Sequence, residues 1–198
     1  MRSAPDGQIR MSEYASFAEL AQFEAPGRDF RIVRIDRPRS PALIIAPHGG
    51  EIEVGTSEIA ALIAAADHSL FCFEGLKPDG RSRALHITSH RFDHPDCLAL
   101  ASRHETVLCV HGCRGRAQIF VGGLDLPLAT RVSGRLALAR FDVVSDGHPY
   151  PGRHPQNVCN RGARQRGVQL EITHDLRRPE HRARIAAAVR AALEDASS

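Results

Sequence analysis

The chain has 198 residues, of which 42% are hydrophobic and 25% are charged. These values are typical of one globular domain and exclude a disordered chain, and no apolar run is long enough to span a bilayer. Aromatic residues make up only 5% and Trp is absent, which argues against a base-stacking surface for nucleic acids. The net charge is +3, and nearly all of the positively charged side chains are arginines. The planar guanidinium fork of arginine suits carboxylate recognition. We therefore expect a protein that binds neither nucleic acid nor membrane.

The N-terminal region, residues 1–30, is polar and is interrupted by Pro and Gly, without the apolar core of a signal peptide. We expect it to be an extension that is part of, or docked on, a domain formed by residues 31–198. The five cysteines are an odd number, which without a secretory signal predicts free thiols in a reducing compartment. Cytoplasmic synthesis is the expectation, and release by lysis would give access to the cell exterior.

From residue 30 onward, short apolar runs alternate with helical patterns. The runs predict strands at residues 30–35, 42–46, 69–73, 85–88, 106–110, 119–121, 141–144 and 168–172. Helices are predicted after an N-cap at Thr56 and at residues 95–102, 126–140 and 179–193. The alternation predicts a single three-layer α/β domain with a mixed central sheet.

Polar side chains follow three of these strands where the apolar run ends. They are His48, Glu74 and His111, and Glu171 lies near the end of the last strand. In open α/β sheets, ligands bind outside the carboxyl ends of the strands. Two histidines and a carboxylate are a common set for catalytic zinc, which takes three protein ligands and keeps one position for water. The alternative is that each histidine is a structural hydrogen-bonding group.

The segment 47–56 is dense in such groups, and its glycines allow the backbone to fold tightly. Glu51 and Glu53 are both candidates to join His48 on one ion, and the spacing from His48 to Glu51 is the H-x-x-E of metallocarboxypeptidases. A His-Gly-Gly loop can equally serve as the oxyanion loop of a serine hydrolase. The chain has no G-x-S-x-G elbow, which weakens that interpretation.

A second group surrounds the later histidine. In a continuous strand, Cys109, His111 and Cys113 would share one face and resemble a structural Cys/His zinc site. Gly112 is expected to end the strand, so that the three side chains diverge and the thiols stay free.

The loop at residues 157–162 is rich in hydrogen-bonding groups. It contains Asn160 and Arg161, and arginine beside asparagine is suited to clamping a carboxylate, because the guanidinium fork matches two oxygens. The alternative is an ordinary surface loop that turns at Gly162.

Several ordered motifs resemble those of the phage-type poly-γ-glutamate hydrolase family. They are PHGGEIEVGTSEIA (47–60), LHITSHRFDHPDCLAL (85–100), VHGC (110–113), FVGGLD (120–125) and CNRGARQRGVQLEIT (159–173). The resemblance extends from about residue 40 to the C-terminus. It implies a zinc-carboxypeptidase-like fold and a zinc-dependent (Zn²⁺) hydrolase that cleaves γ-glutamyl amide bonds and depolymerises poly-γ-glutamate.

The same resemblance implies a ligand set for the metal. His48 and Glu53 match the first two zinc ligands of the family in the order H-G-G-x-I-E-x-G-T, and His111 matches the third. Glu51 falls at the variable position of that motif, so the resemblance favours Glu53 over it.

The remaining roles that the resemblance implies concern catalysis and substrate. Glu171 looks like the general base of zinc carboxypeptidases, and Arg161 with Asn160 resembles their pair that holds a substrate carboxylate. His86 matches a family histidine for which we expect substrate contact or support of the ligands. An anionic γ-linked glutamate polymer or peptide is the expected partner.

Two further functions stay open from the sequence. The same chemistry can act on γ-glutamyl links of cell-wall peptides or on small amides. A non-catalytic metal- or polyanion-binding domain would keep the zinc but lack the base, and Glu171 argues against it.

Overall fold

The structure, a computed structural model, describes residues 14–194. Its strands are β1 (Phe30–Ile35), β2 (Ala42–Gly50), β3 (Ser69–Gly75), β4 (Thr106–Cys113), β5 (Gln118–Gly123), β6 (Asp142–Val144) and β7 (Val168–Thr173). Its α-helices are α1 (Phe17–Leu20), α2 (Thr56–Ala64), α3 (Pro95–Ala101), α4 (Leu126–Leu138) and α5 (Pro179–Glu194). Three 3-10 helices complete the elements: η1 (Arg81–Leu85), η2 (Val158–Arg161) and η3 (His174–Arg177).

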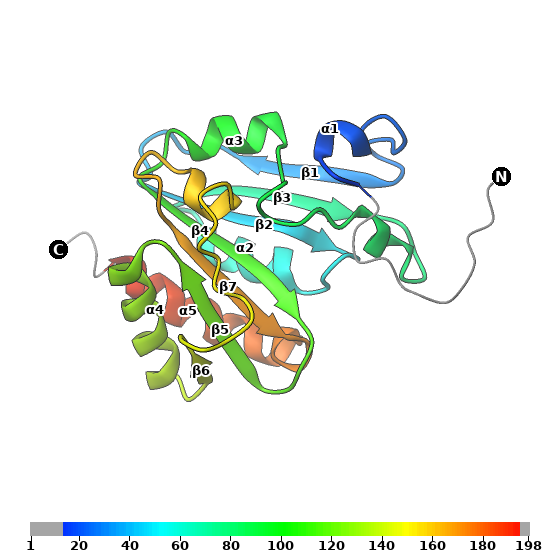
Figure 1. The fold of residues 1–198 in the computed structure, drawn as a ribbon. Coiled ribbons are helices and arrows are strands. Elements are labelled where there is room, and N and C mark those ends of the chain that lie inside the picture. Colours follow the sequence, from blue (N-terminus) through cyan, green and yellow to red (C-terminus); the bar gives the residue numbers. More distant parts are fainter. Residues whose placement is uncertain (1–13, 195–198) are drawn as a thin grey trace.

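The strands form one mixed sheet in the order β1-β3-β2-β4-β7-β5-β6. The four inner strands β3, β2, β4 and β7 are parallel, while β1 and β5 flank them antiparallel and β6 runs parallel to β5. Helices lie on both faces of the twisted sheet, which gives three layers (Figure 1). The predicted α/β class with a mixed central sheet is confirmed.

Strands in the centre of the sheet read as continuous apolar runs because both of their faces are covered. β3 and β7 are buried at every position, and β2 is buried at all positions but its last. Two hydrophobic cores result, one on each face. Ile44, Val110 and Leu170 face α2, α4 and α5, whereas Ile45 and Cys109 face α1, α3 and η2.

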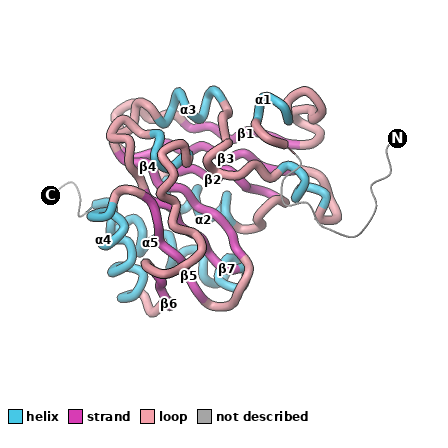
Figure 2. Tube along the Cα trace, in the orientation of Figure 1, coloured by secondary structure: helices cyan, strands magenta, loops and turns pink. Residues whose placement is uncertain are grey.

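Figure 2 shows the helices as cyan segments on either side of the magenta sheet, joined by long pink loops. The helix α4 begins after Asp125, whose carboxylate accepts a hydrogen bond from the backbone N–H of Leu128 and caps the helix. Within residues 14–194, no helix is both long and apolar enough to cross a membrane.

Two local predictions are wrong. Residues 85–88 do not form a strand: Leu85 ends η1, and the chain then crosses the sheet as a loop that anchors the fully buried Ile87 in the second core. The N-cap of α2 is Gly55 rather than Thr56, because the chain turns there with a φ of +97°. Thr56 is the first helical residue, and its hydroxyl donates to the carbonyl of Glu53 at 2.9 Å.

Part of the expected N-terminal extension lies within the described residues. Leu20 is fully buried in the second core, and the ring of Phe17 packs edge-on against Phe30 and Phe73. The segment before β1 is therefore packed onto the domain from Tyr14 onward, and residues 1–13 of the expected extension lie outside the described residues.

Candidate metal centre

His48 reaches the site through an irregularity in β2. Between Ala46 and Gly49 the pairing with β3 shifts by one residue, which is the signature of a β-bulge. Strict alternation would point His48 to the same face as Ala46, toward the helix α2. The extra residue turns the imidazole to the opposite face, where its Nδ1 lies 3.1 Å from the Nδ1 of His111.

His111 lies within β4, which continues to Cys113. The expectation that Gly112 ends the strand is therefore wrong, and Cys109, His111 and Cys113 do share one face. Only His111 of these three joins the cluster with His48, because the Cys109 thiol lies in the hydrophobic core beside Cys159.

Glu53 is held by the turn that follows β2. Its backbone N–H donates to the carbonyl of His48 at 2.9 Å, and its Oε2 accepts from the backbone N–H of Gly112 at 2.7 Å. These bonds leave Oε1 directed at His48, with the Nδ1 of that ring 3.1 Å away. Glu51 is exposed, and its N–H bonds to Gly75, so it is not part of the cluster.

The geometry of His48, Glu53 and His111 fits a tetrahedral cation. Their ligand atoms lie within 4.8 Å of one another, and two of the three separations are 3.1 Å. Ligand atoms about 2.0–2.1 Å from a tetrahedral zinc ion are separated from each other by about 3.3 Å. Two imidazoles and one carboxylate, nearly all of them buried, are also the chemistry that a catalytic zinc site requires.

Hydrogen bonds around the cluster leave the Nδ1 atoms of the two histidines facing each other. The Nε2 of His48 donates to the carbonyl of Ile87 at 2.7 Å, which leaves Nδ1 free for a cation. The Nε2 of His111 lies 3.4 Å from the hydroxyl of Ser89, and its Nδ1 faces His48. Such outer partners orient metal-binding histidines in proteins and increase their basicity. Both partners come from the loop that replaces the strand expected at 85–88.

Charges in the cluster are arranged to favour a positive centre. Burial opposes a charge on His48, but the Glu53 carboxylate outweighs burial and raises the pKa of the imidazole. Burial and the neighbouring His48 both lower the pKa of His111. A proton, or a cation in its place, is thus stabilised between the two imidazoles and the carboxylate.

Glu171 lies beside His111 on the same face. The two residues are register partners on the neighbouring parallel strands β4 and β7, so their side chains project side by side. Burial raises the pKa of Glu171 well above its ordinary value, Glu53 raises it further, and Arg177 acts in the opposite direction. Glu171 is not one of the three clustered ligand groups.

Of the other predicted residues, His86 reaches the cluster and Glu74 does not. The His86 ring stacks on His48 with 3.9 Å between centroids, and its Nε2 is 3.7 Å from Oε1 of Glu53. The charge on His48, followed by burial, lowers the pKa of His86 to about 3. Glu74 is buried in an ion pair with Arg31 at the other side of the sheet.

The Asn160 side chain is a hydrogen-bond hub within its own loop. Its Oδ1 accepts from the N–H groups of Leu124 and Gly167, and its Nδ2 donates to the carbonyls of Gly152 and His154. The amide thus has its full complement of partners inside the protein. Arg161 is partly exposed at the end of η2.

The guanidinium of Arg161 donates to Oε1 of Gln156 at 2.6 Å. That acceptor is an exposed, neutral amide, and among the described residues no carboxylate forms an ion pair with Arg161. Its charge therefore remains available to an anion from outside the protein.

Sequence reasoning missed two residues, Gln169 and Arg177, that support the candidate site. Gln169 donates from Nε2 to Oε1 of Glu171 at 3.0 Å and accepts from Nδ2 of Asn157 at 2.7 Å, which holds the carboxylate in one orientation. Arg177 is buried and donates to the carbonyls of Ile172 and Val54, which ties the turn of Glu53 to β7. The alternation of polar Gln169 and Glu171 in an apolar strand was the signal available for Gln169.

The five cysteines are free and buried, as the sequence predicted. Cys113 lies closest to the cluster, and burial, followed by Glu171, raises the pKa of its thiol to about 12. A thiol with so high a pKa stays protonated at neutral pH, and Cys113 is not one of the three clustered ligand groups.

Replacing Gly50 with Ala is expected to destabilise the protein by about 3 kcal/mol, since a Cβ would add strain and steric overlap. Gly50 has a φ of +60°, and the added Cβ would lie 2.5 Å from the carbonyl oxygen of Gly75. Gly80→Ala is the matched control, with a φ of +73° but open space around it, and should cost about 1 kcal/mol. Urea unfolding of both variants measures the difference, and equal losses would contradict close packing of the metal-binding turn on β3.

Fold and site together define a class of protein. Metallopeptidase-like proteins of Shewanella species share this fold at 13–16% identity, with TM-scores of 0.52–0.55. The domain therefore has the fold of these carboxypeptidase-like structures. Within this class, the chain belongs to the poly-gamma-glutamate hydrolase family, whose model matches residues 14–185. The match begins at residue 14, whereas the resemblance in the sequence begins at about residue 40.

Two relatives from Bacillus subtilis match most of this chain. The SPbeta prophage-derived protein YoqZ of Bacillus subtilis (strain 168) is 36% identical over 177 residues, which cover 88% of this chain and 63% of YoqZ. YndL of the same organism is 38% identical over 168 residues, which cover 83% of this chain and 65% of YndL. The chain thus spans a little under two thirds of the length of either relative.

Solved structures extend the comparison. A bacteriophage poly-gamma-glutamate hydrolase matches with a TM-score of 0.89 and 28% identity, covering 94% of this chain and 98% of the other. A zinc-free form of YndL matches with a TM-score of 0.86 and 32% identity, covering 94% of this chain and all of the YndL chain.

Proposed function

We propose that this protein is a zinc-dependent hydrolase that cleaves γ-glutamyl amide bonds and that its substrate is poly-γ-glutamate. The convergence of His48, Glu53 and His111 in a member of this family is the observation that carries the proposal. The donor set favours zinc, because imidazole nitrogen is a poor ligand for Mg²⁺ or Ca²⁺. The zinc-free form of the related YndL points to the same metal.

The residues around the cluster have distinct tasks in this proposal. Zinc, when bound, supplies Lewis-acid chemistry that polarises the scissile carbonyl and favours water as a nucleophile at neutral pH. Glu171 takes the proton of the attacking water and delivers it to the leaving nitrogen. Gln169 keeps the carboxylate of Glu171 oriented through the 3.0 Å hydrogen bond to Oε1. His86 lies against the ring of His48 and limits its movement.

A γ-linked substrate suits a carboxypeptidase-like site. Every internal residue of poly-γ-glutamate keeps a free α-carboxylate next to its γ-amide, so a carboxylate-binding arginine can act at internal positions of the chain. We assign this role to Arg161, which resembles the clamp arginine of zinc carboxypeptidases. Asn160, whose amide is bonded within the loop, holds the backbone that presents Arg161.

The proposed function is tested by metal analysis of the purified protein and by a gel assay of poly-γ-glutamate before and after chelation. We expect about one zinc per chain, degradation of the polymer, loss of activity with a chelator and recovery with added zinc. Degradation at the same rate by metal-free protein would refute the metal role. An intact polymer, with cleavage of γ-glutamyl links in cell-wall peptides or small amides, would transfer the activity to that substrate class.

Replacing Arg161 with Lys is expected to lower kcat/KM on the polymer by about 10-fold or more, because a point charge does not reproduce a bidentate pair with a carboxylate. Arg164→Lys is the control: Arg164 lies on the same loop, is exposed and only approaches Asp125 at 3.9 Å. Steady-state kinetics on the two variants checks the prediction. Wild-type kinetics in the Arg161 variant would leave residues 157–162 as an ordinary surface loop.

A further inference from the structure

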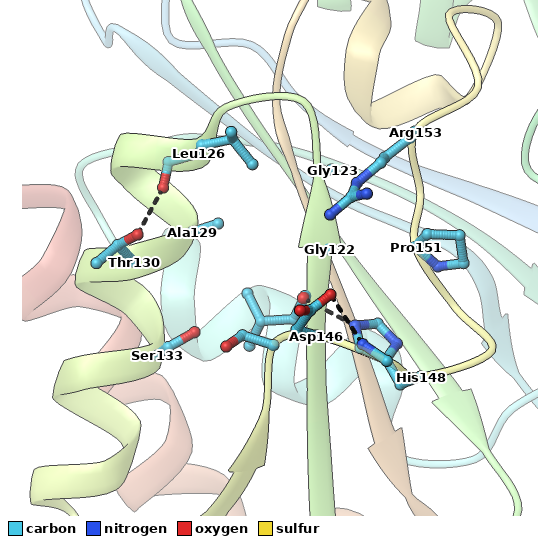
Figure 3. A pocket seen from close by; sticks show the side chains of 13 residues that line it. Gly122, Gly123, Leu126, Ala129, Thr130, Ser133, Asp146, His148, Pro151 and Arg153 are labelled. Atoms are coloured by element: carbon cyan, nitrogen blue, oxygen red, sulfur yellow. Dashed lines mark hydrogen bonds between the residues drawn. The ribbon is translucent and has the colours of Figure 1, made fainter.

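A cavity of about 420 Å³ lies at the edge of the sheet, where β5 passes β6 and turns into α4. Figure 3 shows its walls: one side is α4, with Leu126, Ala129, Thr130 and Ser133, and the other is the loop that carries Asp146, His148 and Arg153. Gly122 and Gly123 form its floor. The cavity is within the size range of small-molecule sites, and no residue of the proposed zinc cluster lines it.

Arg153 gives this cavity its charge. The guanidinium projects from the loop toward Gly122 and Gly123 (Figure 3). Among residues 14–194 it has neither a hydrogen-bond partner nor an ion-pair partner, although this chain pairs many of its other arginines. An unpaired arginine at the mouth of a cavity is a site for an anion from outside the protein.

The backbone on both sides of Arg153 is fixed. The carbonyl of Pro151 accepts from the N–H of Gly123 at 2.9 Å. The buried amide of Asn160 donates to the carbonyls of Gly152 at 2.8 Å and His154 at 3.0 Å, which brackets Arg153 directly. The arginine is therefore presented by a loop that is already ordered, which reduces the entropy lost when a ligand binds.

The rest of the lining matches a glutamyl unit. Leu126 is 60% exposed and stands with Ala129 on the helix side, where they offer apolar contact to methylene groups. The hydroxyl of Ser133 is buried without a partner in the described part of the chain, so it can donate to a ligand. Asp146 accepts from the N–H of Gly147 and keeps a second oxygen, which can accept from the amide N–H of a γ-linked backbone.

The cavity lies next to the proposed catalytic face. Its floor residue Gly122 is the register partner of Gln169 on β7, and Gln169 donates to Glu171. The register therefore places the floor one strand across from Gln169 and two residues along β7 from the base. A polymer bound at the zinc cluster can reach the cavity with a neighbouring repeat.

We propose that this cavity is a second carboxylate subsite, in which Arg153 receives the α-carboxylate of a γ-glutamyl unit that lies away from the scissile bond. The proposal rests on the proposed function for the identity of the ligand. The subsite gives the protein a preference for γ-linked chains of several residues over single γ-glutamyl amides, because only a longer chain fills both positions.

Kinetics of Arg153→Ala test the subsite, with Arg39→Ala as the matched control. Arg39 is also exposed and without a partner among the described residues, but it precedes β2 at the opposite end of the strand from His48. The Arg153 variant should raise KM for long poly-γ-glutamate about 10-fold with kcat within about twofold, the loss expected for one charge-assisted contact. KM for a γ-glutamyl dipeptide should stay unchanged in both variants. Equal KM values for the polymer in the two variants would overturn the proposal.

Direct binding separates a failure of the subsite from a failure of the proposed function. Calorimetric titration of metal-free protein with a γ-linked glutamate pentamer should show about 10-fold weaker binding for Arg153→Ala, and for Thr130→Trp, which narrows the cavity from an exposed helix position. A pentamer with α-carboxamides should bind all variants equally. If the wild-type protein does not hydrolyse the polymer but these binding differences hold, the proposed function fails and the subsite stands. If both variants bind the pentamer as tightly as the wild type, the subsite is refuted.

Discussion

Replacing Glu171 with Gln is expected to lower kcat on poly-γ-glutamate by about 10²–10⁴-fold, the range for removal of a general acid–base group. Glutamine keeps the shape and can still accept the hydrogen bond from Gln169, but it cannot take up a proton. Glu171 is not one of the three clustered ligand groups, so zinc content and thermal unfolding should change little. Turnover, metal content and the unfolding midpoint of the same preparation check the three parts of this prediction.

The control for this variant is Glu51→Gln, which makes the same chemical change at an exposed carboxylate in the turn after β2. It should keep wild-type turnover. If Glu171→Gln loses zinc, Glu171 is a ligand and the assignment of Glu53 is in question. If the variant keeps both zinc and turnover, the base lies elsewhere, with His86 the next residue to test because its ring lies against His48.

Replacing His111 with Ala is expected to weaken zinc binding by more than the roughly 100-fold typical of losing an outer partner of a metal site. The imidazole Nδ1 is one of the three donors in the cluster, and its neighbour on β7, Glu171, is not among them. Zinc stabilises only a fold that binds it, by about 2.7 kcal/mol at a concentration 100 times the Kd. We therefore expect added zinc to raise the unfolding temperature of the wild type and not that of His111→Ala.

His174→Ala is the comparison for this experiment, since His174 is an exposed histidine that follows β7. It should retain the zinc-dependent rise in unfolding temperature. Because His111 is buried, Glu53→Gln provides a second variant that keeps the side-chain volume and the acceptor for Gly112. Zinc-dependent stabilisation in both ligand variants that equals the wild type would place the metal at other residues.

Glu171 and the clustered groups share a set of supporting residues that link distant parts of the chain. Asn157 at the start of η2 bonds Gln169, which bonds Glu171. Arg177 bonds the turn of Glu53 from behind, and a Cβ at Gly112 would lie 2.5 Å from its guanidinium carbon. The glycine at position 112 therefore leaves room for the guanidinium of Arg177.

The curated relatives exceed this chain in length, and the chain corresponds to a little under two thirds of YoqZ and of YndL. The described elements nevertheless contain the complete His–Glu–His cluster, Glu171 and the cavity of Arg153.

Much of the fold follows from local patterns in the sequence. Apolar runs predicted the four inner strands, because a strand that is buried on both faces must be apolar at nearly every position. Helical patterns predicted α2, α4 and α5, because a helix that packs on a sheet places its apolar residues on one face. The predicted strand at 85–88 is wrong, because Leu85 and Ile87 are apolar for another reason. Both side chains pack into a hydrophobic core from a segment that is not a strand.

The donors of the candidate metal centre were also recognisable, because His48, Glu53 and His111 occur within ordered motifs. Their convergence was not derivable from spacing. A bulge in β2 reverses the face of His48, and the register between β4 and β7 decides that Glu171 lies beside His111. Bulges and register depend on pairing between segments that are far apart in the chain, so no local pattern contains them.

In the Asn160 loop too, the sequence predicted the kind of residues present, and the structure decided what they contact. Its composition indicated hydrogen bonding and a carboxylate clamp, and the sequence by itself determined that polar groups gather there. Only the tertiary structure decided that the Asn160 amide bonds the backbone on both sides of Arg153 and that Arg153 faces a cavity against α4. The physical reason is that a side chain's partners depend on which distant segments pack against it, whereas residue type and spacing describe only its neighbours in the chain.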